Sequence, residues 1–374
     1  MSSPRYISPE ISRKLRALSF LGAVSVVIIH SNPLETIADP LWAGRLGNWV
    51  GYLQRWAVPY FFITSGFFFD RGYAAVDRDT MGFFHAKARS LLVPYLLWGA
   101  VYGTLTMTPV LMGVNRMKGV DICIGTIFQD FEIWPLVNRV FGIAMASPPN
   151  GALWYVRLCM IFFLFAPVWR WLRKRVLWSI PCMAFGCIMF GTPFLRGYST
   201  ESITVHGTMI ACSLLGIGYL LLGMTASIFR AERLRVDFSC MVSMLIAWCA
   251  WTYVTIESSL GALDIAPSVV LWNHKVSGML LIGALWGALD IAWPVLAKIR
   301  PEIIGLSFWI YCMHHPVTSC VGAALHAVLG RTLIGEVWRL ILSAPITLSI
   351  CIVCGLMVRK CGVVYSLLTG GRSK

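Results

Sequence analysis

Long apolar runs dominate this sequence, and they constrain its fold more than any other feature. Ten stretches of about 20 residues are apolar enough to cross a bilayer as helices. Only 13% of the 374 residues are charged, against about 25% in soluble domains, and the mean hydropathy is +0.72. A soluble globular fold is therefore excluded. The sequence predicts an all-α polytopic integral membrane protein.

The domain organisation follows from where these runs lie. The predicted spans cover residues 15–31, 49–69, 90–112, 152–170, 176–194, 206–228, 238–256, 271–293, 303–328 and 336–358. The first run lacks a small-residue cleavage site, so we interpret it as a span and not as a signal peptide. Residues 113–151 mix aromatic and charged side chains and are expected to form a re-entrant or interfacial segment. We treat 15–358 as a single membrane domain between a short N-terminal segment (1–14) and a basic tail (359–374).

Basic residues gather in every second predicted loop. The clusters are Arg13, Lys14 and Arg16; Arg71, Arg78, Lys87 and Arg89; Arg173, Lys174 and Arg175; Arg230, Arg233 and Arg235; Lys298 and Arg300; and Arg359 and Lys360. Lys and Arg are enriched in cytoplasmic loops, so this alternation predicts that both termini are cytoplasmic. The same rule accounts for the net charge of +14, and no nucleic-acid partner is expected.

Ionisable side chains within the predicted spans are the first functional candidates, because they are costly in a bilayer. Arg55 and Arg157 lie early in their spans, and a structural role as snorkelling or ion-paired side chains is an equal alternative for both. His314 and His315 precede Pro316, which removes a helical hydrogen bond and predicts a broken helix beside a cavity. Adjacent helical positions differ by about 100°, so at most one of the two histidines is expected to face that cavity. No HExxH motif or coherent His and Cys spacing is present, so no metal site is expected.

His30 ends the apolar run SVVIIHSNP (25–33) and has two interpretations, a polar cap at a wet interface or a catalytic base. Arg16 precedes it by fourteen residues, which places both on one helix face about 21 Å apart. Lys87 and Arg89, just before the third span, would join Arg16 at a basic cytoplasmic mouth. Such a stripe suits a long anionic donor that reaches into the membrane. Positive-inside anchoring is the alternative for each cation taken singly.

Five stretches, in matching order from about residue 11 to about residue 358, resemble the membrane acyltransferase-3 family. They are ALSFLGAVSVVIIHSN (17–32), RWAVPYFFITSGFFF (55–69), FHAKARSLLVPYLLW (84–98), LWYVRLCMIFFLFAPV (153–168) and GLSFWIYCMHHPV (305–317). The resemblance implies an O-acyltransferase that moves an acyl group, acetyl or succinyl, from cytoplasmic acyl-CoA to a hydroxyl of a sugar. The acceptor would be a surface polysaccharide or glycolipid, and the location the bacterial cytoplasmic (inner) membrane.

The resemblance also implies roles for particular residues. The catalytic group is His30 as general base, Arg157 and His314; the donor-binding group is Arg16, Lys87 and Arg89; the acceptor or oxyanion group is Arg55, Trp154 and Tyr311. No cofactor is expected to be bound permanently, with acetyl-CoA or succinyl-CoA as the donor substrate. The expected partners are acyl-CoA, a glycan or glycolipid acceptor and the lipid bilayer, and a homodimer is left open. In two places the chain departs from the family pattern: Ser19 stands where an arginine is common, and Leu158 where an acidic residue is common.

The rival interpretation is a multi-span transporter or flippase for an anionic or glycan substrate. A broken helix with histidines and arginines near mid-depth is typical of such proteins. No repeated pair of broken helices is apparent in the two halves of the sequence. For the enzyme, direct transfer is favoured over an acyl-enzyme, since no Ser-His-acid grouping is visible in the sequence.

Overall fold

The computed structural model describes residues 7–34, 41–74, 79–111, 150–197, 204–233, 235–260, 262–263, 267–296, 298–330 and 332–372. These residues form helices and no strand, which confirms the all-α prediction for the described part of the chain. The expected re-entrant segment, 113–151, lies outside the described residues except for its last two positions.

The helices follow one another in chain order. The first part holds α1 (Pro9–His30), α2 (Leu41–Gln54), α3 (Ala57–Phe69), a π-helical turn η2 (Asp70–Ala74), α4 (Thr80–Lys87), a second π-helical turn η3 (Ala88–Leu92) and α5 (Val93–Leu111). The middle holds a 3₁₀ turn η4 (Gly151–Leu153), α8 (Trp154–Leu164), α9 (Ala166–Arg175), α10 (Ser179–Gly197), α11 (Thr204–Ile228) and a 3₁₀ turn η5 (Ala231–Arg233). The last part holds α12 (Phe238–Ser259), α13 (Pro267–Leu296), α14 (Pro301–Ile304), α15 (Ser307–Leu329), α16 (Leu333–Arg359) and α17 (Gly362–Thr369).

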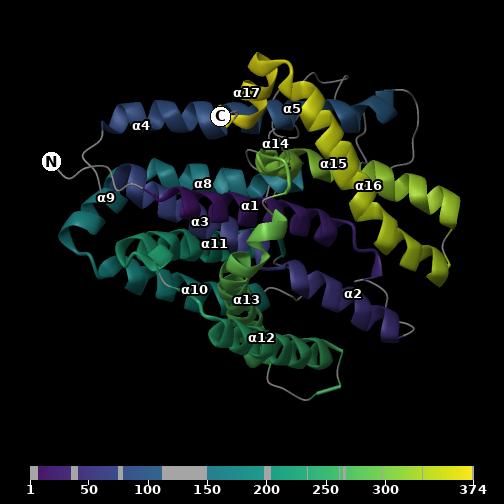
Figure 1. The fold of residues 1–374 in the computed structure, drawn as a ribbon, viewed down its shortest axis with the longest axis horizontal. Helices are drawn as coiled ribbons and strands as arrows, with labels where there is room; N and C mark the ends of the chain where they lie inside the picture. The colour runs from purple at the N-terminus through teal and green to yellow at the C-terminus, as the bar shows by residue number, and fades with distance from the viewer. Residues whose placement is uncertain are drawn as a thin grey trace.

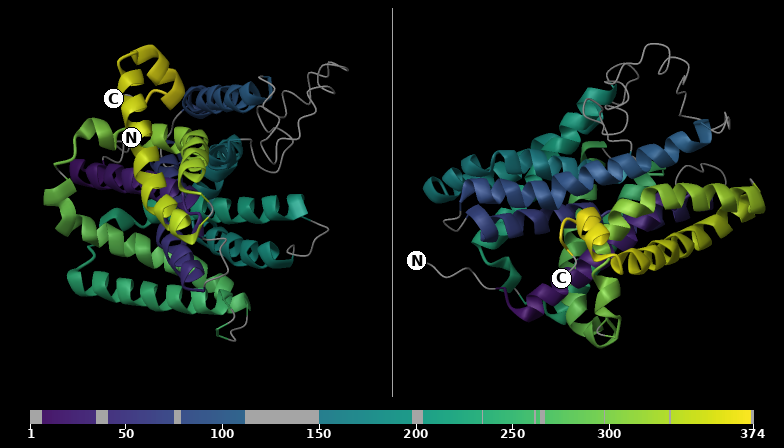
Figure 2. Two further views of the ribbon diagram at one scale, coloured as in Figure 1. Left: turned by 90° about the vertical axis from the view of Figure 1, so that its right-hand side faces the viewer. Right: turned by 90° about the horizontal axis from the view of Figure 1, so that it is seen from above.

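Helix α1 crosses the middle of the molecule and organises the fold (Figure 1). It begins where Ser8 accepts a hydrogen bond from the Ile11 N–H at 3.3 Å, followed by Pro9 at the first helical position. Along its length it contacts α2, α3, α13, α15 and α16, and Figure 2 shows it enclosed among these helices from two further sides. His30, at its last position, is thereby carried toward α15.

Two predicted spans are bent because of proline. Residues 49–69 form the end of α2 and all of α3, with a break at Arg55, because Pro59 cannot donate to the Arg55 carbonyl and its ring clashes with it. Residues 152–170 form α8 and α9, which meet at 60°, and Pro167 stands in the first turn of α9. Both runs were predicted as single spans. The proline in each run was the sequence signal for the break, and the continuous apolar pattern gave no indication of it.

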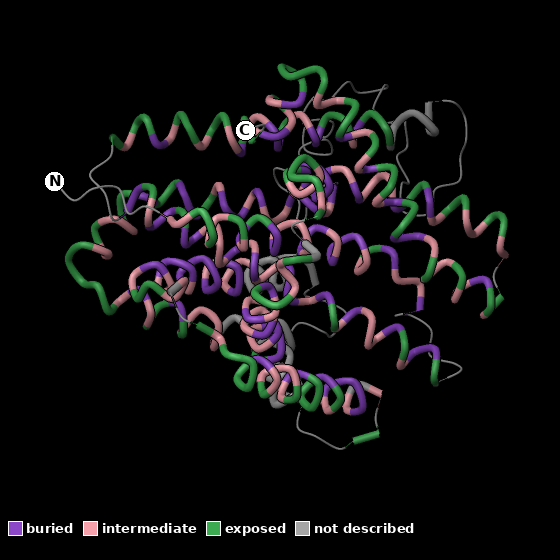
Figure 3. Tube along the Cα trace, in the orientation of Figure 1, coloured by how far each residue is buried: buried purple, intermediate pink, exposed green. Residues whose placement is uncertain are grey.

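Three described helices are long and apolar enough to cross a bilayer: Phe238–Ser258, Val276–Pro294 and Leu333–Arg359. The bent pair α8 and α9 makes a fourth if it counts as one span. Helix α16 also carries an exposed apolar stripe that includes Trp338, Ile341 and Val353, spaced as on one helix face; Figure 3 shows exposed positions recurring along this outer helix. The count of ten spans and the cytoplasmic termini stay predictions.

Helices α3 and α11 pack at backbone contact. A Cβ atom added to Gly66 would overlap the backbone of Leu220, and one added to Gly223 would overlap the carbonyl oxygen of Ile63. Close approach through small residues is the usual way in which membrane helices associate. The packing of α3 against α11 therefore requires glycine at position 66. Helix α3 also carries aromatic residues that pack near the histidines.

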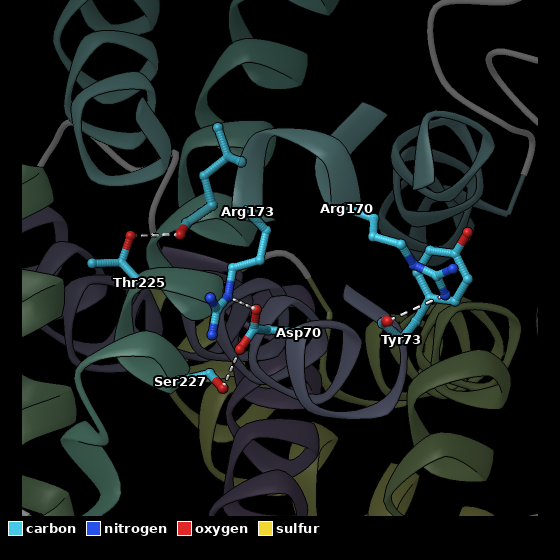
Figure 4. A network of polar contacts seen from close by, with 7 residues as sticks. Asp70, Tyr73, Arg170, Arg173, Thr225 and Ser227 are labelled. Carbon is cyan, nitrogen blue, oxygen red and sulfur yellow. Dashed lines mark hydrogen bonds and ion pairs between the residues drawn. The ribbon is translucent and has the colours of Figure 1, made fainter. Parts of the chain in front are cut away.

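A buried polar network ties η2 to α9 and α11 (Figure 4). Asp70 is fully buried and accepts from Arg173 Nε at 2.8 Å and from Ser227 Oγ at 2.6 Å. Arg170 places its guanidinium 3.6 Å from the ring centre of Tyr73 and donates to the Tyr73 carbonyl at 3.3 Å. Two of the residues expected to act only as loop charges, Arg173 and Arg71, are thus ion-paired, the latter with Glu232.

Candidate functional site

Three histidines meet where α1 ends against α15. The ring centres of His30 and His314 lie 5.2 Å apart, and those of His30 and His315 lie 5.6 Å apart. His30 is the last residue of α1, whereas His314 and His315 are adjacent on α15, far away in the sequence. The sequence named His30 and His314 as members of one expected catalytic group, but it gave neither their distance nor the place of His315 beside His30.

The hydrogen bonds of His314 identify its protonated nitrogen. His314 is fully buried, and its Nδ1 lies 2.8 Å from the Tyr311 carbonyl oxygen and 3.2 Å from that of Ile310. A carbonyl only accepts, so Nδ1 must carry the proton. In the neutral ring, Nε2 is then an acceptor, and it has no hydrogen-bond partner among the described groups.

A pocket of about 320 Å³ opens beside His30. It is lined by the end of α1, by α15 and by α16, through His30, Ser31, Asn32, His315, Thr318, Ser319, Arg339 and Ser343 among others. Of the adjacent histidines, His315 lines this pocket and His314 lies behind it, as their angular separation on a helix predicts.

The pocket holds several buried polar atoms that are without a protein partner. Within the described part of the chain, Ser31 Oγ, Thr318 Oγ1, His315 Nδ1 and Arg339 Nε make no hydrogen bond. Arg339 is held in place by Glu336, to which its Nη1 donates at 2.6 and 2.7 Å. Buried polar atoms are normally satisfied, so this concentration of unsatisfied donors and acceptors fits a pocket for a polar molecule.

The sequence predicted a broken helix at Pro316, and that prediction is wrong: α15 runs without interruption from Ser307 to Leu329, because a side chain satisfies the carbonyl that the proline frees. The helical partner of the missing Pro316 N–H would be the Cys312 carbonyl, which instead accepts from Asn150 Nδ2 at 3.1 Å. Asn150 is fully buried and also caps η4, since its Oδ1 accepts from the Ala152 N–H at 3.2 Å. The α15 helix therefore continues through the proline.

Three packed aromatic side chains next to the histidines, Phe61, Tyr155 and Tyr311, are here named the aromatic wall. Tyr311 is buried, lies 6.1 Å from His314 and 5.6 Å from Phe61 between ring centres, and donates its hydroxyl hydrogen to the Ala152 carbonyl. Tyr155 packs against both Phe61 and Tyr311, and its hydroxyl lies 2.5 Å from Ser65 Oγ. Of the site residues expected from the sequence, Tyr311 is thus next to the cluster.

The other expected site residues lie on α8 and at the junction of α2 and α3. Trp154 packs on Phe62 at 5.4 Å between ring centres. Arg157 is half-buried on α8 and interacts electrostatically with Tyr95 of α5. Arg55, at the break between α2 and α3, lies 4.1 Å from the ring centre of Tyr52.

The three expected donor-binding cations lie on three elements, α1, α4 and η3. Arg16 is exposed on α1 and Arg89 is exposed on η3. Lys87 is half-buried at the end of α4, with its Nζ 4.5 Å from the ring centre of Phe163. Lys87 also interacts electrostatically with Cys159 of α8, which packs in the core beside Tyr155.

The two departures from the family pattern have structural explanations. Ser19 Oγ donates to the Leu15 carbonyl at 2.8 Å and lies 3.5 Å from the Tyr60 hydroxyl, which donates to the same carbonyl at 2.8 Å. Leu158 is buried and lies against Gly216 of α11, where the added Cβ of an alanine would already overlap it. A charged residue at either position would need a different packing.

Several residues of the site were missed by the sequence reasoning. Tyr102 of α5 lies 5.6 Å from His315 between ring centres, and Asn150, Tyr155 and Arg339 were not candidates. A signal existed for Asn150, which precedes a helix as a capping residue does, and for Arg339, which is ionisable and inside a predicted span. No three His, Cys, Asp or Glu side chains of the described residues are placed to hold one metal ion.

The chain is similar to a known protein family and to a relative of known name. The family model described as an acyltransferase domain (acyltransferase-3) matches residues 14–356. A relative from Rhizobium meliloti (strain 1021), the succinoglycan biosynthesis protein ExoH, is 23% identical over 326 residues, which cover 82% of this chain and 78% of that protein. No solved structure matches the chain.

Proposed function

The chain belongs to the acyltransferase-3 family and is an integral membrane acyltransferase, and on that premise we propose that it transfers an acyl group from acyl-CoA to a sugar hydroxyl. The acceptor would be a polysaccharide or glycolipid at the membrane, since the relative from Rhizobium is named for the biosynthesis of a glycan. Acetyl-CoA and succinyl-CoA are the donors to test first.

One observation carries the proposal: a polar pocket with unsatisfied hydrogen-bonding atoms has His30 in its wall. A sugar presents many hydroxyl groups, each able to donate and accept, and such groups suit a pocket whose lining includes Ser319, Asn32 and His315. The pocket is large enough for a small part of a glycan rather than for a whole chain. A hydroxyl bound there lies beside an imidazole.

The reaction we propose is direct transfer. A nitrogen of His30 takes the proton of the acceptor hydroxyl while the hydroxyl oxygen attacks the thioester carbonyl carbon. The tetrahedral oxyanion collapses, the carbon–sulfur bond breaks, and the departing thiolate takes the proton from His30. The products are an ester and free coenzyme A, and the histidine returns to its starting state.

His314 is proposed to support His30. Its Nδ1–H is held by the carbonyls of Tyr311 and Ile310, so the ring cannot rotate without losing both bonds. This fixed neutral ring, whose centre lies 5.2 Å from that of His30, limits the positions that the His30 side chain can adopt. The Nε2 atom of His314 is left as a hydrogen-bond acceptor in the buried interior. Lys87, Arg89 and Arg16 would bind the donor phosphates, while Arg157 and Arg55 would bind the acceptor or the oxyanion.

A direct assay tests the proposal. Purified protein in nanodiscs receives acetyl-CoA or succinyl-CoA labelled in the acyl group, together with membrane glycans of the source cell. We expect free thiol to appear in step with labelled, alkali-sensitive glycan ester. Thiol release that stays at the level of empty nanodiscs with every glycan and donor tried would contradict the proposal, and glycan flux in liposomes without any acyl donor would favour the transporter.

A further inference from the structure

The segment from Gly362 to Arg372, here named the C-terminal clamp, is anchored on the helices that carry the site. Its α17 helix lies beside α5 (Figures 1 and 2). Trp98 of α5 donates its indole N–H to the Leu368 carbonyl at 3.0 Å. Tyr365 is buried and stacks on Trp309 of α15, with ring centres 5.9 Å apart. The clamp therefore contacts both the third predicted span and the histidine helix.

Two glycines turn the clamp back onto η3. Gly370 ends α17 in the left-handed conformation, with φ +66°, and Gly371 follows with φ +78°. A Cβ atom added to Gly370 would overlap the backbone of Ser90. Both the backbone angle and the close approach therefore require glycine at position 370.

The turn delivers Arg372 to the π-helical turn η3. Its Nη1 donates to the Ser90 carbonyl at 3.0 Å and to the Thr369 carbonyl at 2.7 Å, and its guanidinium carbon lies 3.9 Å from the ring centre of Phe308. Both bonds use one nitrogen, so the N–H groups of Nη2 and Nε are not used by them. Arg372 forms no ion pair with any described carboxylate.

Arg372 contacts η3, α17 and α15 but keeps a part of its side chain exposed to solvent. Desolvation by these neighbours lowers the pKa of Arg372. Tyr155, Cys159 and Cys312 are among the neighbours of Arg372, and Cys159 is also a neighbour of Lys87. Two cations from different parts of the chain thus lie near the same part of the core.

This region is next to the histidine cluster. Arg372 covers Phe308, and His314 follows six residues later on the same helix, about 9 Å along its axis. An anion held at Arg372 would therefore lie one to two helical turns along α15 from the level of His314. The cations expected from the sequence, Lys87 and Arg89, precede Ser90 by three residues and by one residue.

We propose that the C-terminal clamp completes an anion site in which Arg372, with Lys87, binds a phosphate group of the acyl-CoA donor. This rests on the proposed function. The planar guanidinium, with its unused N–H groups, suits bidentate contact with phosphate oxygens. The clamp fixes the distance from this phosphate to His314, because Gly370 and Trp98 hold the turn against the helices.

The test uses the full-length protein in nanodiscs of neutral lipid and measures coenzyme A binding by calorimetry. Arg372→Gln should raise the Kd for coenzyme A about tenfold or more, the loss expected for a charge-assisted contact, and Arg372→Lys should lie between. Lys360→Gln removes an exposed cation near the clamp and should leave the Kd unchanged. Gly370→Ala keeps every cation but displaces the turn, and should weaken binding as Arg372→Gln does.

Kinetics and lipid composition separate the remaining possibilities. In the transfer assay Arg372→Gln should raise KM for the donor and leave kcat within about twofold. A wild-type Kd in Arg372→Gln at an unchanged melting temperature would overturn the clamp proposal while leaving the acyltransferase intact. Arg372-dependent binding of pyrophosphate without any acyl transfer would instead overturn the proposed function alone. Arg372-dependent binding of anionic lipid but not of coenzyme A would assign the site to a lipid headgroup and overturn the donor site.

Discussion

The side-chain amide of Asn150 lies 3.1 Å from the Cys312 carbonyl oxygen, the one that Pro316 leaves without its helical donor. The two groups are 162 residues apart in sequence, and both are buried. This contact ties η4, at the start of the α8 segment, to the helix that carries the histidines. The position of α15 at the histidine site therefore depends on the side-chain amide of Asn150.

We expect Asn150→Ala to lower the free energy of unfolding by about 1–3 kcal/mol, because a buried carbonyl loses its donor. The sharper measurement is a double-mutant cycle with Pro316→Ala. Alanine at 316 restores the helical N–H to Cys312, so Asn150→Ala should cost less in that background. Denaturant titrations in detergent give the four stabilities, and equal costs in both backgrounds would show that Asn150 does not replace the helical donor.

His30→Ala should lower kcat for acyl transfer by about 10²–10⁴-fold, the usual contribution of a general base. Coenzyme A binding should be unaffected, since the imidazole lies at the acceptor pocket. The matched control is His85→Ala, which removes an exposed histidine on α4 and should leave kcat unchanged. Transfer at the wild-type rate by His30→Ala would remove the base assignment.

The helical frame could be predicted from the sequence, because apolar runs report burial and span length directly. The runs at 206–228 and 238–256, for example, differ from α11 and α12 by only a few residues at each end. The breaks at Arg55 and at the α8–α9 junction were not predicted, although Pro59 and Pro167 indicate them in the sequence. A hydropathy profile averages over a window of residues, so it does not register the single backbone N–H group that a proline removes.

The candidate site was predictable only in part. His30 and His314 stand out because an ionisable group in an apolar run is unusual, but their approach to 5.2 Å is a tertiary contact. Arg372 gave no such signal, since one arginine among basic terminal residues fits a cytoplasmic tail equally well. Its position depends on the Gly370 turn, and on Tyr365 and Trp98, none of which is distinctive in a sequence of this composition.

Asp70→Asn should lower the free energy of unfolding by about 3–5 kcal/mol, because it leaves Arg173 without its buried partner. The change preserves side-chain shape, so the loss reports charge and hydrogen bonding rather than volume. Asp237→Asn is the control: Asp237 is an exposed cap of α12 that accepts from the Cys240 N–H, and asparagine caps as well as aspartate does. A melting temperature for Asp70→Asn equal to that of Asp237→Asn would mean that the network in Figure 4 contributes little.

Gly66→Ala tests whether the histidine site depends on the packing of α3 against α11. The added methyl group meets the Leu220 backbone, which cannot move aside as a flexible side chain can, so we expect overpacking to cost about 1–3 kcal/mol. Ser65 is the next residue and bonds Tyr155, so the same displacement should also reduce acyl transfer. Gly186→Ala is the matched control, because nothing lies within 4 Å of the added atom on α10. If both variants melt and react alike, then α3 and α11 can separate without disturbing the aromatic wall.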